Sequence, residues 1–104
     1  MLDWFEWINK DVVNEKAKLI AFPYAGGGVS VFRKWEKYFD NIKLYAAQYP
    51  GRENRMSEEP INEFNVLLNE VYQNIKSIID DDTLYYLFGH SLGTKLVYEL
   101  TLRI

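Results

Sequence analysis

The chain has 104 residues, of which 48% are hydrophobic, and it contains 12 Lys and Arg, 15 Asp and Glu and no cysteine. This length allows one small domain with a hydrophobic core, the net charge of -3 argues against nucleic acid as a partner, and the absence of cysteine excludes disulfides and thiolate metal sites. No apolar run approaches the length of a membrane span, and residues 1–4 lack the features of a signal peptide, so we expect a cytoplasmic protein with no membrane partner and no cofactor.

The first half of the chain predicts two strands with a helix between them. Residues 2–9 are aromatic and predict a short helix or cap that covers the sheet. A compact apolar run at 18–22 predicts the first strand, and residues 43–48 predict the second. Ser30 is a favourable N-cap residue, so we expect a helix from there to about residue 40. Its inward face would comprise Val31, Phe32, Trp35, Tyr38 and Phe39.

The second half begins with a polar loop at 50–60 and a long helix. Asn62 would cap this helix, which runs to about residue 79, with Ile61 and Val66 forming a hydrophobic staple at its first turn. Its buried stripe would comprise Val66, Leu67, Val71, Ile75, Ile78 and Ile79. Residues 80–82 are three adjacent aspartates, and they mark the turn that follows rather than a metal site, because adjacent carboxylates cannot all converge on one ion.

A final strand and helix complete an α/β pattern. The apolar run at 84–88 predicts a buried strand, and the helix after it has apolar residues at positions 96, 97, 100 and 104. Strands that alternate with helices predict a parallel sheet of about three strands joined by right-handed crossovers.

Residues 89–93, Gly-His-Ser-Leu-Gly, match the G-x-S-x-G pattern of a nucleophile elbow. The pattern stands between the predicted strand and helix, which is the context that an elbow requires. The turn is sharp enough to strain the central serine, and glycines on both sides avoid collisions with the neighbouring strand and helix. Ser91 is therefore the candidate nucleophile of a partial α/β-hydrolase fold. In that fold the 18–22 strand would lie centrally, between the 43–48 strand and the 84–88 strand. The 84–88 strand normally pairs with a further strand, and within these 104 residues we expect it to be a bare edge.

A glycine-rich loop follows the first predicted strand, at residues 23–28. A serine hydrolase needs a second backbone N–H to stabilise the oxyanion, and this donor comes from the loop after an adjacent strand. A dinucleotide-binding loop is excluded because Val31 occupies the last position of the G-x-G-x-x-G pattern, and no Gly-Lys-Ser/Thr follows for a Walker A loop. An ordinary glycine-rich turn is the alternative.

The chain carries four landmarks in order: Phe-Pro-Tyr-Ala-Gly-Gly at 22–27, Phe-Arg with Trp35 at 32–35, Tyr-Pro-Gly-Arg-Glu-Asn-Arg at 49–55 and Phe-Gly-His-Ser-Leu-Gly at 88–93. Together they resemble type II thioesterases, the stand-alone α/β-hydrolases of nonribosomal peptide and polyketide synthesis. The resemblance covers nearly the whole chain, including the early Trp-Phe pair at 4–5. One small departure is Leu92, which stands where the family often has methionine.

This resemblance implies a thioesterase that hydrolyses acyl or aminoacyl groups from the phosphopantetheine arm of a carrier protein, an editing role that restarts a stalled synthase. Ser91 would attack the thioester carbonyl, and the N–H of Leu92 would be one oxyanion donor. The other donor would be the N–H of Tyr24, with Ala25 as the alternative. A generic esterase or lipase is a rival interpretation, although it would not explain the segment at 50–55.

The catalytic base and its acid are missing from the sequence after Ser91. In α/β-hydrolases both follow the serine, but residues 92–104 contain no His and no Asp. We expect His90 to pack and hydrogen-bond beneath the elbow and Lys95 to be a solvated helix residue. The helix pattern also lacks a stop signal. Residues 1–104 are thus expected to be the N-terminal part of one α/β-hydrolase domain, truncated within this helix, and the second rival interpretation is a catalytically incomplete fragment that only binds a carrier or its missing half.

Basic residues give two further candidates for contacts with a carrier. Arg52 and Arg55 follow the second strand, at the edge where ligands bind in α/β sheets, and would meet a phosphate. Alternatively they form ion pairs that hold the loop, for which Glu53, Glu58 and Glu59 are available. A second group on the first helix would receive an acidic carrier protein or remain solvated, and it comprises Arg33, Lys34 and Lys37.

Overall fold

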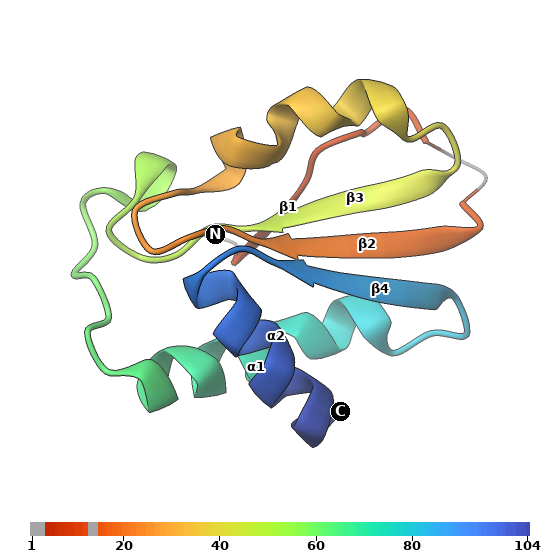
Figure 1. Ribbon diagram of the computed structural model, residues 1–104. Coiled ribbons are helices and arrows are strands. Elements are labelled where there is room, and N and C mark those ends of the chain that lie inside the picture. Colours follow the sequence, from red (N-terminus) through yellow and green to blue (C-terminus); the bar gives the residue numbers. More distant parts are fainter. Residues whose placement is uncertain (1–3, 13–14) are drawn as a thin grey trace.

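A four-stranded sheet with the strand order β1-β3-β2-β4 forms the centre of the computed structural model, which describes residues 4–12 and 15–104 (Figure 1). The strands are β1 (Phe5–Trp7), β2 (Ala17–Phe22), β3 (Ile42–Ala47) and β4 (Leu84–Gly89). β2 pairs in parallel with β3 on one side and with β4 on the other. This confirms the predicted α/β class and the central position of the 18–22 strand.

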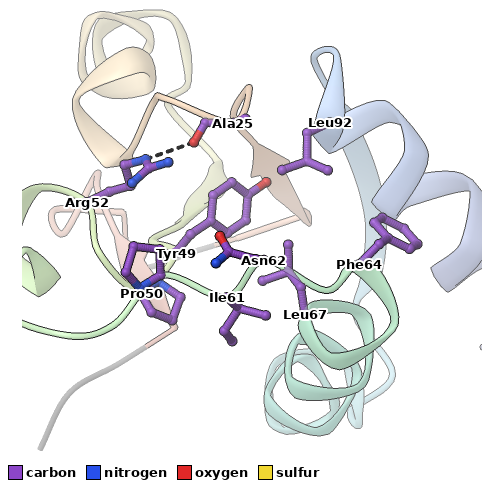
Figure 2. A pocket seen from close by; sticks show the side chains of 10 residues that line it. Ala25, Tyr49, Pro50, Arg52, Ile61, Asn62, Phe64, Leu67 and Leu92 are labelled. Carbon is purple, nitrogen blue, oxygen red and sulfur yellow. Dashed lines mark hydrogen bonds between the residues drawn. The ribbon is translucent and has the colours of Figure 1, made fainter.

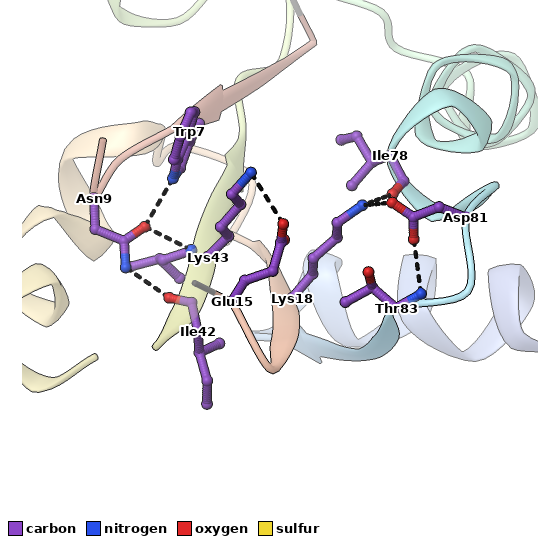
Figure 3. A network of polar contacts seen from close by, with 10 residues as sticks. Trp7, Asn9, Glu15, Lys18, Ile42, Lys43, Ile78, Asp81 and Thr83 are labelled. Atoms are coloured by element: carbon purple, nitrogen blue, oxygen red, sulfur yellow. Dashed lines mark hydrogen bonds and ion pairs between the residues drawn. The ribbon is translucent and has the colours of Figure 1, made fainter. Parts of the chain in front are cut away.

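The segment at 2–9 was expected to be a helix or cap, and this prediction is wrong for its described part. Phe5–Trp7 forms β1, which extends the sheet by pairing antiparallel with β3. The indole of Trp7 stacks on Tyr45, and the side chain of Asn9 accepts a hydrogen bond from Leu44 N and donates one to Ile42 O (Figure 3). The aromatic residues of this segment favour a strand, and pairing with the edge of β3 fixes that conformation. Residues 2 and 3 lie outside the described residues.

Helices cover both faces of the sheet (Figure 1). The 3₁₀-helix η1 (Val29–Tyr38) lies on one face, and the α-helices α1 (Phe64–Ile79) and α2 (Leu92–Arg103) lie on the other. The core on the α1 and α2 face includes Ile20, Phe22, Leu67, Val71, Ile75, Leu96 and Leu100. The core on the η1 face includes Ala21, Val29, Phe32, Leu44 and Ala46.

The first predicted helix has the expected position but a different form. It is a 3₁₀-helix with Gly28 at the N-cap position, so Ser30 lies inside the helix and does not cap it. The Ser30 hydroxyl donates to the Glu53 carboxylate (Oγ to Oε2, 2.5 Å). Three residues per turn place Val29 and Phe32 on one buried face. Tyr38, which was expected to face inward, is 70% exposed at the last turn.

The long helix α1 also departs from the prediction at its start. Glu63 rather than Asn62 caps it, with a carboxylate oxygen that accepts a hydrogen bond from Asn65 N at 2.9 Å. Val66 is 47% exposed, so the expected staple with Ile61 does not form, and Leu68 is buried in its place. The rest of the stripe packs against the sheet as predicted.

The turn between α1 and β4 is held by a buried lysine. Lys18 of β2 is 5% exposed, and its ammonium donates to Ile78 O at 2.6 Å and to the Asp81 carboxylate at 2.7 Å (Figure 3). Hydrogen bonding to Lys18 lowers the pKa of the Asp81 carboxyl below its usual range. The aspartates at 80–82 thus close a turn, and within the described residues no group of acidic or histidine side chains could hold a metal ion.

Candidate active site

Ser91 lies at the junction between the end of β4 and the start of α2, where the chain reverses direction. Its backbone has φ 58° and ψ -112°, a region that non-glycine residues rarely adopt. The flanking backbone is fixed by hydrogen bonds from His90 N to Phe22 O at 3.1 Å and from Thr94 N to Ser91 O at 2.9 Å. The predicted sequence of strand, strained turn and helix is therefore present, with the Ser91 side chain exposed.

Two glycines allow this turn to pack closely. A Cβ atom on Gly93 would lie 2.0 Å from Phe22 O, and one on Gly89 would lie 2.2 Å from Gly93 O. Real Cβ atoms do not approach backbone atoms so closely, so no other residue fits at either position without a backbone shift. These contacts bring the first turn of α2 directly against the end of β2.

The loop after β2 lies beside this turn and is held by three hydrogen bonds to its carbonyl groups. Pro23 O accepts from the buried hydroxyl of Tyr49 at 2.9 Å, and Ala25 O accepts from Arg52 Nε at 2.9 Å. Tyr24 O accepts from Gly27 N, also at 2.9 Å. Among the described residues, the N–H groups of Tyr24, Ala25 and Leu92 donate no hydrogen bond. These are the three N–H groups that the sequence suggested as oxyanion donors.

The two basic residues next to Ser91 have other contacts. His90 was expected to pack beneath the elbow, but its side chain is exposed and its ring lies edge-on to Tyr24, with the ring centroids 5.5 Å apart. The strained turn directs the His90 side chain outward, across the loop after β2. The ammonium of Lys95 lies over the ring of Phe64 at 4.3 Å, on the exposed side of α2.

The structure distinguishes the two arginines of the 50–60 loop. Arg55 is 6% exposed, forms a bidentate ion pair with Glu58 at 2.8 and 2.9 Å, and lies over the ring of Trp4. Hydrogen bonding to Arg55 lowers the pKa of the Glu58 carboxyl. Arg55 therefore holds the loop, as the ion-pair alternative predicted. Arg52 instead donates to the carbonyl groups of Ala25 and Gly51 and pairs with no carboxylate among the described residues.

The candidate contacts on the first helix have partners or remain solvated. Arg33 forms an exposed ion pair with Glu6 at 2.8 Å, and Lys37 lies over the ring of Tyr38. Lys34 is exposed. The arrangement fits solvated helix residues and shows no built anion site on this helix.

A cavity of about 260 Å³ opens between the loop after β2, the loop after β3 and the start of α1 and α2 (Figure 2). It was not expected from the sequence. Ala25 and Leu92 line it from the two sides of the candidate oxyanion site, whereas Ser91 does not line it. The other lining residues are Tyr49, Pro50, Arg52, Pro60, Ile61, Asn62, Phe64 and Leu67.

Comparisons with known proteins agree on one family. The thioesterase domain model matches residues 17–104. The chain is 37% identical to the gramicidin S biosynthesis protein GrsT of Aneurinibacillus migulanus over 98 residues, which are 91% of this chain and 38% of GrsT. It is 35% identical to the medium-chain S-acyl fatty acid synthase thioesterase of Homo sapiens over 82% of this chain and 32% of that protein.

A solved structure gives the same result for the fold. The type II thioesterase BorB from the borrelidin biosynthetic cluster superposes with a TM-score of 0.85 and 28% identity, over 96% of this chain and 40% of BorB. The chain thus spans less than half of the length of each of these three proteins. No helix of the described residues is long and apolar enough to cross a membrane.

Proposed function

The chain belongs to the thioesterase domain family, and from this premise we propose that Ser91 is the nucleophile of a thioester hydrolysis. The observation that carries the proposal is the strained backbone of Ser91 between β4 and α2. This geometry exposes the hydroxyl at the carboxyl edge of the sheet, next to the N-terminus of a helix whose dipole favours developing negative charge.

We further propose that the substrate is an acyl or aminoacyl group on the phosphopantetheine arm of a carrier protein. Ser91 Oγ attacks the thioester carbonyl, the oxyanion receives hydrogen bonds from Leu92 N–H and from Tyr24 or Ala25 N–H, and the thiol of the arm leaves. Water then hydrolyses the acyl-enzyme. The names of two relatives specify gramicidin S biosynthesis and the borrelidin biosynthetic cluster, and they support a role in a biosynthetic pathway of this kind. The editing role is part of our proposal.

The residues of this chain do not supply the base for that reaction. Residues 92–104 contain no His and no Asp. The ring of His90 contacts Tyr24, and the ammonium of Lys95 contacts the ring of Phe64. Without a base, only the oxyanion donors and substrate binding contribute to the rate. We therefore propose that residues 1–104 hold the nucleophile part of one α/β-hydrolase domain, with turnover orders of magnitude below that of a complete enzyme. The test must then detect the nucleophile position without requiring a base.

Ser91→Cys provides that test, because the chain has no other cysteine and a thiolate attacks a thioester without a general base. At the N-terminus of α2 the thiol pKa is lowered, and the oxyanion donors act on the same tetrahedral intermediate. We expect octanoyl-pantetheine to acylate this variant about 100-fold faster than it acylates Ser77→Cys, an exposed position near the end of α1. Intact-protein mass spectrometry measures the added octanoyl group. Equal rates for the two variants would reject Ser91 as the nucleophile.

Tyr49 offers a test of the oxyanion donor. Its hydroxyl holds Pro23 O, and the Tyr24 N–H belongs to the same peptide plane, so this one hydrogen bond orients the proposed donor. Burial raises the pKa of the hydroxyl, which keeps it a donor. We expect Tyr49→Phe to slow acylation of Ser91→Cys about tenfold.

The matched control for Tyr49→Phe is Tyr45→Phe, because Tyr45 stacks on Trp7 and lines a different pocket, together with Trp4, Phe5 and Ile78. This control should leave the acylation rate unchanged. A second readout separates orientation from folding: far-ultraviolet circular dichroism and the reactivity of Ser77→Cys should be equal in both phenylalanine variants. If Ser91→Cys is acylated equally fast with and without Tyr49→Phe, the Tyr24 N–H is not the oxyanion donor, and the Ala25 N–H is the remaining candidate.

A further inference from the structure

The cavity beside the elbow begins where the reacting carbonyl would be. Leu92 follows the proposed nucleophile and Ala25 belongs to the loop of the second oxyanion donor, and both line the cavity (Figure 2). A group attached to a carbonyl between these two N–H donors would therefore have the cavity as an adjacent space. At about 30 Å³ for a group the size of a water molecule, a volume of about 260 Å³ corresponds to roughly nine such groups.

The walls of this cavity are mostly apolar. Ile61, Phe64 and Leu67 form the side contributed by α1 and the segment before it, and two prolines and Leu92 add further apolar surface. The hydroxyl of Tyr49 is committed to Pro23 O. An alkyl chain placed here would lose water contact against these apolar walls. The amide of Asn62 also lines the cavity and belongs to an exposed residue.

The single formal charge in the lining belongs to Arg52, and no carboxylate lines the cavity. Three acidic residues of the neighbouring segments have other partners: Glu53 accepts from Ser30, Glu58 from Arg55, and Glu63 from Asn65 N. Glu59 is exposed and does not line the cavity. Within the described residues, the guanidinium of Arg52 is thus held by carbonyl groups and not neutralised. Its charge disfavours a cation in the cavity.

We propose that this cavity receives the alkyl chain of the acyl group and discriminates against aminoacyl groups, whose ammonium would lie near Arg52. The proposal rests on the proposed function of Ser91 and narrows its substrate class to uncharged acyl groups of medium length. It assigns chain binding to the walls at Ile61, Phe64 and Leu67, and discrimination against the ammonium to Arg52.

The test compares two ligands that differ only in one ammonium group. These are pantetheine analogues in which an amide replaces the thioester, carrying either an octanoyl or a 2-aminooctanoyl group, titrated into the full chain by calorimetry. At about pH 6.5 the amine is a cation, and we expect the octanoyl analogue to bind about tenfold more tightly or better. At about pH 9 the amine is neutral, and the difference should shrink to about twofold. Affinity should rise about threefold for each methylene up to octanoyl and then level off.

Substitutions assign the effect to the cavity. Ile61→Asp places a carboxylate in the wall and should weaken octanoyl binding about tenfold while it improves 2-aminooctanoyl binding. Arg52→Gln removes the charge from the lining and should raise the affinity for the 2-aminooctanoyl analogue relative to that for the octanoyl analogue. Val66→Asp is the matched control, because Val66 is 47% exposed on the first turn of α1 and does not line the cavity. It should change neither affinity.

Three outcomes would overturn the proposal: equal binding of the two ligands at pH 6.5, no binding of the octanoyl analogue, or the same effect from Ile61→Asp and Val66→Asp. The result is separable from the test of the nucleophile, since binding does not need the Ser91 hydroxyl and should persist in Ser91→Ala. Octanoyl binding without acylation of Ser91→Cys would reject the nucleophile and keep the cavity. Acylation without octanoyl preference would reject the cavity alone.

Discussion

Gly93→Ala is expected to remove most of the folding stability of this chain, with a loss of about 4 kcal/mol or more in the free energy of unfolding. The added Cβ would lie 2.0 Å from Phe22 O and 2.7 Å from Phe22 C. Both are backbone atoms of the central strand, so no side-chain rotation can relieve the contact. Either α2 moves away from the sheet, which uncovers Leu96 and Leu100, or the end of β2 shifts.

Urea denaturation followed by circular dichroism measures the effect of Gly93→Ala. Gly26→Ala is the matched control, since the nearest atom to its added Cβ is a Tyr24 ring carbon at 3.7 Å and the residue is exposed. The free energy of unfolding of this control should lie within about 1 kcal/mol of that of the parent chain. Gly89→Ala should behave like Gly93→Ala because its Cβ would lie 2.2 Å from Gly93 O. If Gly93→Ala were as stable as Gly26→Ala, the turn at Ser91 would not be packed against β2 as described.

The elbow and the strands β2 and β4 could be predicted because local sequence determines them strongly, and the central position of β2 followed from the hydrolase fold that the elbow indicates. Only glycine permits the close approach at positions 89 and 93, and the apolar runs that became β2 and β4 have β-branched or aromatic residues and clear turn signals on both sides. Parallel pairing then follows from the intervening helices. The position of Ser91 between strand and helix needed no information from the rest of the chain.

Features that depend on distant segments could not be predicted. β1 exists because β3 offers a free edge, and the hydroxyl of Ser30 leaves its own helix because Glu53, 23 residues away, reaches it. The same holds at the candidate site. Arg52 and Tyr49 come from the segment after β3, and only the fold brings them to the carbonyl groups of the loop after β2. Their sequence positions after a parallel strand predict that they lie at the carboxyl edge of the sheet, but they do not predict the hydrogen bonds to Pro23 O and Ala25 O.

The free edge of β4 leads to a second prediction, which is that the chain associates with copies of itself through this strand. This strand ends the sheet and pairs only with β2 among the described residues, so one row of its N–H and C=O groups has no strand partner. It carries no charge, and Leu84, Tyr86 and Phe88 are 58%, 53% and 40% exposed. The buried strand that the apolar run alone predicted is therefore wrong, whereas its expected position at the edge is confirmed. A long, uncharged, apolar edge is the kind that pairs with other chains.

We therefore expect the chain to form dimers or larger species as its concentration rises. Tyr86→Lys should weaken this association about tenfold or more, because a lysine on an edge strand disfavours pairing with a second chain and shortens the apolar surface of β4. Sedimentation velocity over a range of protein concentrations measures both chains. Tyr38→Lys is the matched control: it makes the same substitution at a tyrosine that is 70% exposed on η1, away from the edge, and should leave the association unchanged. A parent chain that remains a monodisperse monomer at every concentration, or equal effects of the two lysine variants, would mean that β4 is not the surface through which chains pair.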